Sequence, residues 1–205
     1  AMAEELSERT KLGDRLRVIA GAAPEGFAEP RDAVGRRRER GVPEGAVVVD
    51  GAGVTPEALG ELVAALGREA AETPVVVLDP PPGIAEVAGS AILVPAMDAV
   101  DRAAAMASAS VLVAPGEMPS YGWRVLEALA LGVPVVAAAS PAQHELVGEG
   151  GTLIEGGADA LAASVVPLLG PNAERRRAAT LAADRGRAFS WREAGERVWQ
   201  LHAEL

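Results

Sequence analysis

The chain has 205 residues, a net charge of −10 and 49% hydrophobic residues. This composition excludes disorder as the main state, and the length allows one core of respectable size. Because cysteine is absent and the two histidines are isolated, we expect no metal site built on these residues. The sequence has no strongly basic face and no apolar stretch as long as a bilayer, so we expect neither nucleic acid nor a membrane span. The absence of cysteine and of a recognisable signal peptide fits the cytoplasm.

Short apolar segments rich in valine alternate with longer segments of helical character. The apolar segments are too short for helices, and β-branched residues favour strands. Strands are predicted at residues 16–20, 46–50, 74–79, 91–94, 110–114, 133–138 and 152–154. Helices are predicted at residues 31–40, 56–71, 98–107, 123–131, 140–147, 158–169, 173–189 and 191–205. The alternation predicts a single α/β domain, Rossmann-like and doubly wound, with a mostly parallel sheet of six or seven strands covered by helices on both faces.

Residues 110–139 form the segment in which we expect the chemistry, because they read as one strand–helix–strand crossover. In such a unit the N-terminus of the helix at 123–131 can hold a phosphate. Glu127 lies about one turn inside this helix, where a carboxylate suits two neighbouring hydroxyls, as on a ribose. The alternative is that Glu127 only stabilises the positive end of the helix dipole. The spacing of the residues leaves both interpretations open.

The stretch SYGWRVLEALALGVPVVAA resembles the donor-site segment of retaining GT-B glycosyltransferases of family four. The positions that fit the family pattern are Tyr121, Gly122, Leu126, Glu127, Ala128, Ala130, Gly132, Pro134, Val135 and Val136. The resemblance implies that the domain is the C-terminal, donor-binding half of a GT-B fold and that its ligand is a nucleotide sugar, with no cofactor and no metal. It also implies that Glu127 binds the ribose and that the backbone of Gly122 and Trp123 approaches the sugar and its phosphates.

The same resemblance supplies the remaining donor-binding candidates. Ser120 and Tyr121 precede the helix, and Arg124 lies in its first turn. Gly51 follows the strand whose loop meets the diphosphate in the family, and the backbone around Pro95 is the expected contact for the base. Glu117 is the one catalytic candidate, and no other residue is assigned as catalytic.

Two departures from the family pattern make the donor site degenerate. The family has two glutamates eight residues apart, but Pro119 stands eight residues before Glu127, and Glu117 is two residues too early unless the loop has an insertion. The family also clamps the diphosphate with an Arg and a Lys, whereas no Arg or Lys lies between Gly41 and Gly67. Losing two charge-assisted contacts weakens diphosphate binding substantially.

Arg124 occupies a position where the family usually has proline. A cation at the positive end of a helix dipole is slightly unfavourable, so a ligand is one reason for its presence. We hypothesise that Arg124 supplies part of the positive charge missing from residues 51–60. The alternative, which is favoured because exposed arginines are common, is that Arg124 points into water.

The domain organisation leaves two functions open. Residues 1–13 are interpreted as the tail of a preceding domain or as a tag or linker, and residues 14–205 as the donor-binding domain. The first function is the donor-binding domain of a hexose-transferring enzyme, which is inactive until an N-terminal acceptor-binding domain joins it in cis or in trans. The second is a non-catalytic domain that kept the fold and acts in binding or protein interaction, because fold alone does not fix function.

Overall fold

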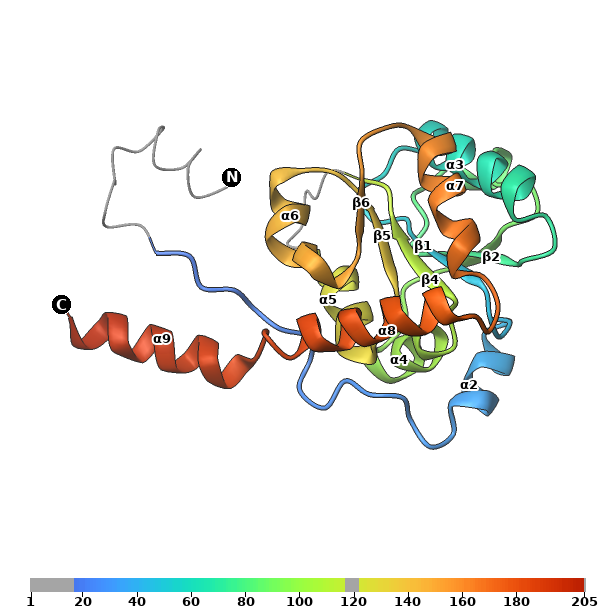
Figure 1. Cartoon of the computed structure of the whole chain (residues 1–205). Helices are drawn as coiled ribbons and strands as arrows, with labels where there is room; N and C mark the ends of the chain where they lie inside the picture. The colour runs from blue at the N-terminus through green and yellow to red at the C-terminus, as the bar shows by residue number, and fades with distance from the viewer. Residues whose placement is uncertain (1–16, 117–121, 205) are drawn as a thin grey trace.

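The computed structural model describes residues 17–116 and 122–204, and its centre is one sheet of six parallel strands in the order β3-β2-β1-β4-β5-β6 (Figure 1). The strands are β1 (Val47–Asp50), β2 (Val75–Leu78), β3 (Ile92–Val94), β4 (Val111–Ala114), β5 (Val135–Ala138) and β6 (Thr152–Ile154). Each lies within a segment predicted to be a strand. The Rossmann-like α/β fold is therefore confirmed.

Helices cover both faces of the sheet, as the prediction required. They are α2 (Ala33–Glu39), α3 (Pro56–Glu69), α4 (Ala99–Ala107), α5 (Trp123–Leu131), α6 (Pro141–Val147), α7 (Ala158–Val165), α8 (Ala173–Gly186) and α9 (Trp191–Ala203), with 3₁₀ turns at Ile84–Glu86, Gly148–Gly150 and Val166–Leu168. Alternate strand residues point to opposite faces. Val47 and Val49 pack with α3 and α7, whereas Val48 packs in the cluster that includes α4, α5, α6 and α8.

The strand order places a switch point between β1 and β4. From β1 the chain adds β2 and β3 on one side, then returns to pair β4 with the other side of β1. In open α/β sheets, ligands bind in the crevice beyond the carboxyl ends of the strands at such a point. Helix α5 begins after Gly122 and ends at Gly132, both in the left-handed conformation that glycine tolerates. These two glycines set the two ends of the helix, whose first turn lies beside the carboxyl end of β1.

Two predicted elements differ from the structure. The strand predicted at residues 16–20 is absent over 17–20, where the chain has no regular structure and Val18 is exposed, so the sheet has six strands and not seven. An apolar sequence forms a strand only where a sheet edge accepts it, and here β3 and β6 form the edges. The helix predicted at 158–169 divides after Val165, because Pro167 has no N–H to continue it.

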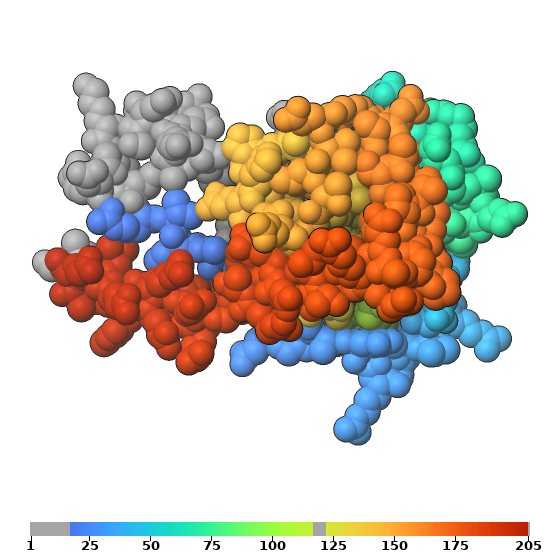
Figure 2. All heavy atoms as spheres, viewed as in Figure 1, coloured from blue at the N-terminus to red at the C-terminus, as the bar shows by residue number. Residues whose placement is uncertain are grey.

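Helix α9 stands outside the layered body. It projects from the end of α8, and the segment that precedes α2 runs beside its base (Figures 1 and 2). Ala194 is its buried residue, while Val198 and Trp199 are exposed. Within residues 17–116 and 122–204, no helix combines the length and apolar character needed to cross a membrane.

Candidate functional site

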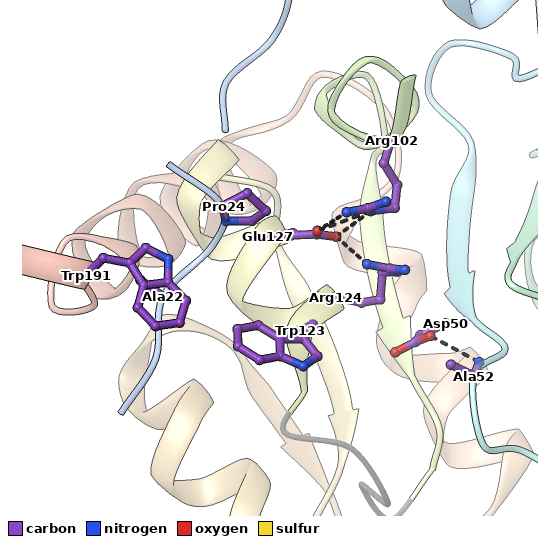
Figure 3. Close-up of a pocket in the computed structure, with 9 residues that line it drawn as sticks. All are labelled: Ala22, Pro24, Asp50, Ala52, Arg102, Trp123, Arg124, Glu127 and Trp191. Atoms are coloured by element: carbon purple, nitrogen blue, oxygen red, sulfur yellow. Dashed lines mark hydrogen bonds and ion pairs between the residues drawn. The ribbon is translucent and has the colours of Figure 1, made fainter. Parts of the chain in front are cut away.

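A pocket of about 320 Å³ opens at the switch point, between the end of β1, the first turn of α5 and the base of α9 (Figure 3). Its volume is at the lower end of the range typical of small-molecule sites, about 300–1,000 Å³. The lining residues are Ala22, Pro24, Asp50, Ala52, Arg102, Trp123, Arg124, Glu127 and Trp191. The sequence therefore brings together groups from five separate segments at the place where the fold class binds ligands.

Glu127 forms the buried centre of the charged side of this pocket. Glu127 is 1% exposed, and both oxygens of its carboxylate accept hydrogen bonds from arginines. Arg102 on α4 donates from Nε to both oxygens at 3.0 and 3.1 Å and from Nη2 to Oε1 at 2.6 Å. Arg124 donates from Nη1 to Oε2 at 2.8 Å. Because the single hydrogen of Nε is shared between the two oxygens, three N–H groups donate to Glu127, and both of its oxygens are paired within the protein.

Arg124 connects Glu127 to a second carboxylate, that of Asp79 at the end of β2. Its Nε and Nη2 atoms lie 3.0 and 2.6 Å from Oδ2 of Asp79. Burial alone lowers the pKa of Arg124, but Asp79 and Glu127 raise that pKa above its ordinary value. The side chain is 17% exposed, so the expectation that Arg124 points into water is wrong. Long-range pairing with Asp79, which a sequence does not display, is the reason.

Asp79 holds an uncommon backbone conformation. Its φ is +50°, and among the described residues it is the one non-glycine residue with a positive φ. Aspartate tolerates this left-handed region better than most residues, at a small cost in conformational energy. The backbone N–H of Asp79 itself donates to the carbonyl of Val94 at 3.1 Å, which fixes the turn after β2. The turn thereby aims the carboxylate at the first turn of α5.

Asp50 is the second carboxylate that lines the pocket, and its surroundings differ from those of Glu127. One oxygen accepts from the N–H of Ala52 at 3.1 Å. Burial raises the pKa of Asp50 to about 6, while the Ala52 N–H and Arg124 oppose the rise. With all groups ionised, the carboxylates of Asp50, Asp79 and Glu127 exceed the guanidiniums of Arg102 and Arg124 by one negative charge.

The opposite side of the pocket is aromatic. Trp123 and Trp191 stack with ring centroids 6.2 Å apart and an angle of 24° between the planes. Trp191 also donates from Nε1 to the carbonyl of Ala23 at 2.8 Å, which ties the start of α9 to the segment before α2. The two indoles remain 40% and 49% exposed, so they offer ring surface to a ligand.

The structure gathers some of the predicted donor-binding residues and separates others. Trp123, Arg124 and Glu127 line the pocket, and Gly122 is buried at the start of α5. Gly51 lies outside the lining, and its lack of a side chain serves packing, because a Cβ there would lie 2.9 Å from the carbonyl oxygen of Leu78. Pro95 is exposed beyond β3, at the far edge of the sheet, and also lies outside the lining. Glu117, Pro119, Ser120 and Tyr121 lie outside the described residues.

Besides three small or apolar lining residues, sequence reasoning missed the charged and aromatic pocket residues Asp50, Arg102 and Trp191. Asp50 carried a usable signal, because a carboxylate ended an otherwise apolar strand next to the switch point. Arg102 was a charge in an alanine-rich helix, and nothing local pointed to Glu127, 25 residues further along the chain. Trp191 begins a helix that the sequence placed at the end of the chain, far from the crossover segment.

One segment of the sequence matches a known family. Residues 94–170 match the family described as glycosyl transferases group 1. This segment includes Arg102, Trp123, Arg124 and Glu127, and it leaves out Asp50 and Trp191. No curated protein sequence matches the chain.

Solved structures of glycosyltransferases are similar in fold. HepE from Anabaena in complex with UDP and glucose has a TM-score of 0.71 and 20% identity, covering 90% of this chain and 55% of that chain. WaaG, a glycosyltransferase involved in lipopolysaccharide biosynthesis, has a TM-score of 0.74 and 18% identity, covering 95% and 58%. Sucrose-phosphate synthase from Thermosynechococcus elongatus has a TM-score of 0.73 and 21% identity, covering 100% and 56%. The chain therefore spans little more than half the length of these structures.

Proposed function

We propose that the chain is the donor-binding, C-terminal half of a GT-B glycosyltransferase, which holds a nucleotide sugar while another domain supplies the acceptor. The observation that carries this proposal is the pocket at the switch point, beside the first turn of α5 and within reach of the segment that matches glycosyl transferases group 1. Open α/β sheets bind ligands at such a point. HepE, which is similar in fold, is described with UDP-glucose and with UDP, and this supports a nucleotide sugar as the ligand.

The diphosphate is expected at the N-terminal end of α5. The first turn of a helix presents backbone N–H groups and the positive end of its dipole to a phosphate. Arg124 lies in that turn, and residues 42–66 contain no Arg or Lys. We expect Arg124 to contact the diphosphate after exchanging its bond with Asp79 for a bond with a phosphate oxygen.

The domain has a limited part in the chemistry. In the reaction the bond between the anomeric carbon and the diphosphate breaks, an acceptor oxygen takes the place of the diphosphate, and the anomeric configuration is retained. The residues described above bind the leaving diphosphate and orient the donor. Because the similar solved structures are almost twice as long, the acceptor site is expected on a further domain, in cis or in trans. The isolated chain should therefore transfer no sugar.

A non-catalytic binding domain is the second candidate function. The observation that favours it is the charge around the pocket, where Arg102 and Arg124 both have carboxylate partners and the sum is negative. Such surroundings weaken the attraction for a diphosphate. A domain that binds neutral ligands or another protein, and no nucleotide sugar, would have the same charges.

Calorimetric titration with UDP-glucose, GDP-mannose and UDP distinguishes the two candidates. The donor-binding function predicts saturable binding of at least one nucleotide sugar, which weakens in Trp123→Ala because an indole face of the pocket is lost. Trp199→Ala is the matched control, since Trp199 is 75% exposed on α9 and lies outside the pocket. Absence of binding in the unmodified chain, or equal weakening in the two variants, contradicts the proposal.

A further inference from the structure

The two carboxylates that line the pocket differ in their remaining capacity for hydrogen bonds. Glu127 accepts from three N–H groups of Arg102 and Arg124, and both of its oxygens take part. Asp50 accepts one bond, from the Ala52 N–H at 3.1 Å, and no other described residue donates to it. Its second oxygen points away from Ala52 (Figure 3). Asp50 is thus the pocket carboxylate with capacity for a ligand.

The position of Asp50 suits a ligand at the switch point. It is the last residue of β1, whose carboxyl end faces the crevice between β1 and β4. Arg124 is the cation that acts on it, but the hydrogen bonds of Arg124 go to Asp79 and Glu127. The charge of Asp50 is therefore incompletely compensated inside the protein, and hydroxyl donors from a ligand would compensate it.

The aromatic side of the pocket provides the complementary surface. Trp123 lines the same cavity as Asp50 and is 40% exposed. The face of an indole packs against flat or weakly polar ring faces, and a carboxylate opposite accepts hydrogen bonds from substituents at the ring edge. A ring with two neighbouring hydroxyls satisfies both surfaces at once.

We propose that Asp50, and not Glu127, accepts the hydrogen bonds of a pair of neighbouring hydroxyls on the bound nucleotide sugar. This inference rests on the proposed function and names the residue that selects its ligand. The hydroxyls belong either to the ribose or to the transferred sugar, and both present the same chemistry. Glu127 acts as a positioning residue, because it holds Arg102 and Arg124 in place.

The pH dependence of binding follows from the same geometry. Burial raises the pKa of Asp50 to about 6, and the charged groups that act on it are Arg124, Asp79 and Glu127. Hydroxyl donors favour the ionised carboxylate, so a bound diol lowers the pKa of Asp50. Affinity should consequently rise between about pH 5 and pH 7 and level off above that range.

The test compares UDP, 2′,3′-dideoxy-UDP and UDP-glucose by calorimetry on the unmodified chain, on Asp50→Asn and on Asp159→Asn. Asp159 is an exposed control that removes the same charge outside the pocket. If the ribose is the source, UDP binds the unmodified chain about tenfold or more tightly than the dideoxy compound, and Asp50→Asn removes this ratio. If the transferred sugar is the source, Asp50→Asn removes the preference for UDP-glucose over UDP. Asp159→Asn should keep either preference.

Several outcomes overturn the inference. If Asp50→Asn keeps both ratios while the unmodified chain binds UDP-glucose, the inference is wrong and the proposed function stands. If the affinity of the unmodified chain for UDP-glucose does not change between pH 5 and pH 7, the inference is also wrong. This measurement needs no variant. If the unmodified chain binds none of the three probes, the inference is wrong as stated for a uridine nucleotide, and the proposed function fails only if GDP-mannose does not bind either.

Discussion

Asp101 and Glu127 are two buried carboxylates, each held by two arginines, yet their surroundings give them different roles. Asp101 on α4 accepts from Arg36 on α2 and from Arg40 at the C-terminal cap of α2, and the hydrogen bonds from these two arginines hold the pKa of Asp101 below its ordinary value. This cluster ties two helices together. Glu127 instead lines a cavity beside Asp50, a carboxylate with unused capacity. An arginine–carboxylate cluster therefore indicates a ligand site only where a cavity and an incompletely bonded neighbour accompany it.

Of the changes considered, removing the carboxylate of Glu127 should have the largest effect, a loss in the free energy of unfolding. Glu127→Ala leaves Arg102 and Arg124 without their shared partner in a buried place, and breaking a buried pair in this way costs about 3–5 kcal/mol. Urea unfolding should show this loss in the free energy of unfolding. Glu61→Ala, on the exposed side of α3, is the control and should change that free energy by less than about 0.5 kcal/mol. Similar losses in both variants would contradict the buried network.

Removing the charge of Asp50 should have the opposite effect on stability, because the negative charge of Asp50 destabilises the folded state. Its pKa rises from 3.8 to about 6 on folding, so its contribution to stability is fully present below about pH 4 and is lost as pH rises through 6. The loss amounts to about 2–3 kcal/mol, and Asp50→Asn should recover it at pH 7 to 8. Urea unfolding at pH 4, 6 and 8 tests this. A variant less stable than the unmodified chain at pH 8 would show that Asp50 is compensated within the protein.

Arg124 and Asp79 offer a smaller effect, measured here in ligand binding. Asp79→Asn removes the anion that competes for Arg124, so affinity for UDP should rise about tenfold, or about 1.4 kcal/mol, while affinity for uridine stays constant. Arg124→Gln should lower affinity for UDP and leave uridine unaffected. Calorimetry with the two ligands measures both ratios. Equal changes for UDP and uridine, or none, would remove Arg124 from the diphosphate site.

The Asp101 cluster should give the smallest and most local effect. Asp101→Asn weakens the contact between α2 and α4, so amide hydrogens of α2 should exchange faster while those of α5 keep their rate. Asp32→Asn removes only the exposed bond of Arg36 and serves as the control. Faster exchange throughout the sheet would show that the cluster stabilises the whole domain and not one helix.

The sequence predicts the fold more completely than the site, and the reason is physical. Helix α5 was placed correctly at both ends, because Gly122 and Gly132 are local signals that act on the backbone directly. Each observed strand fell in an apolar segment, whereas residues 17–20 had the composition of a strand but pair with neither edge strand. Strand formation depends on partners that a local pattern does not contain.

The site depends on contacts between residues that are distant in sequence. Glu127 was identified as a key residue, but its pairing with Arg102 arises from the packing of α4 against α5, which no local spacing displays. Arg124 was judged by the frequency of exposed arginines, and Asp79, 45 residues away, reversed that judgement. The binding roles assigned to Gly122, Trp123, Arg124 and Glu127 stay predictions, as do those assigned to Gly51 and Pro95.

Trp191 gives the projecting helix a connection to the pocket. It is at once the first residue of α9 and part of the pocket wall, stacked on Trp123. A ligand that moves the indole of Trp191 would therefore also act on the first residue of α9. Because such coupling is reciprocal, a partner that restrains α9 through Trp191 would change the affinity of the pocket by the same factor by which the ligand changes the affinity for that partner.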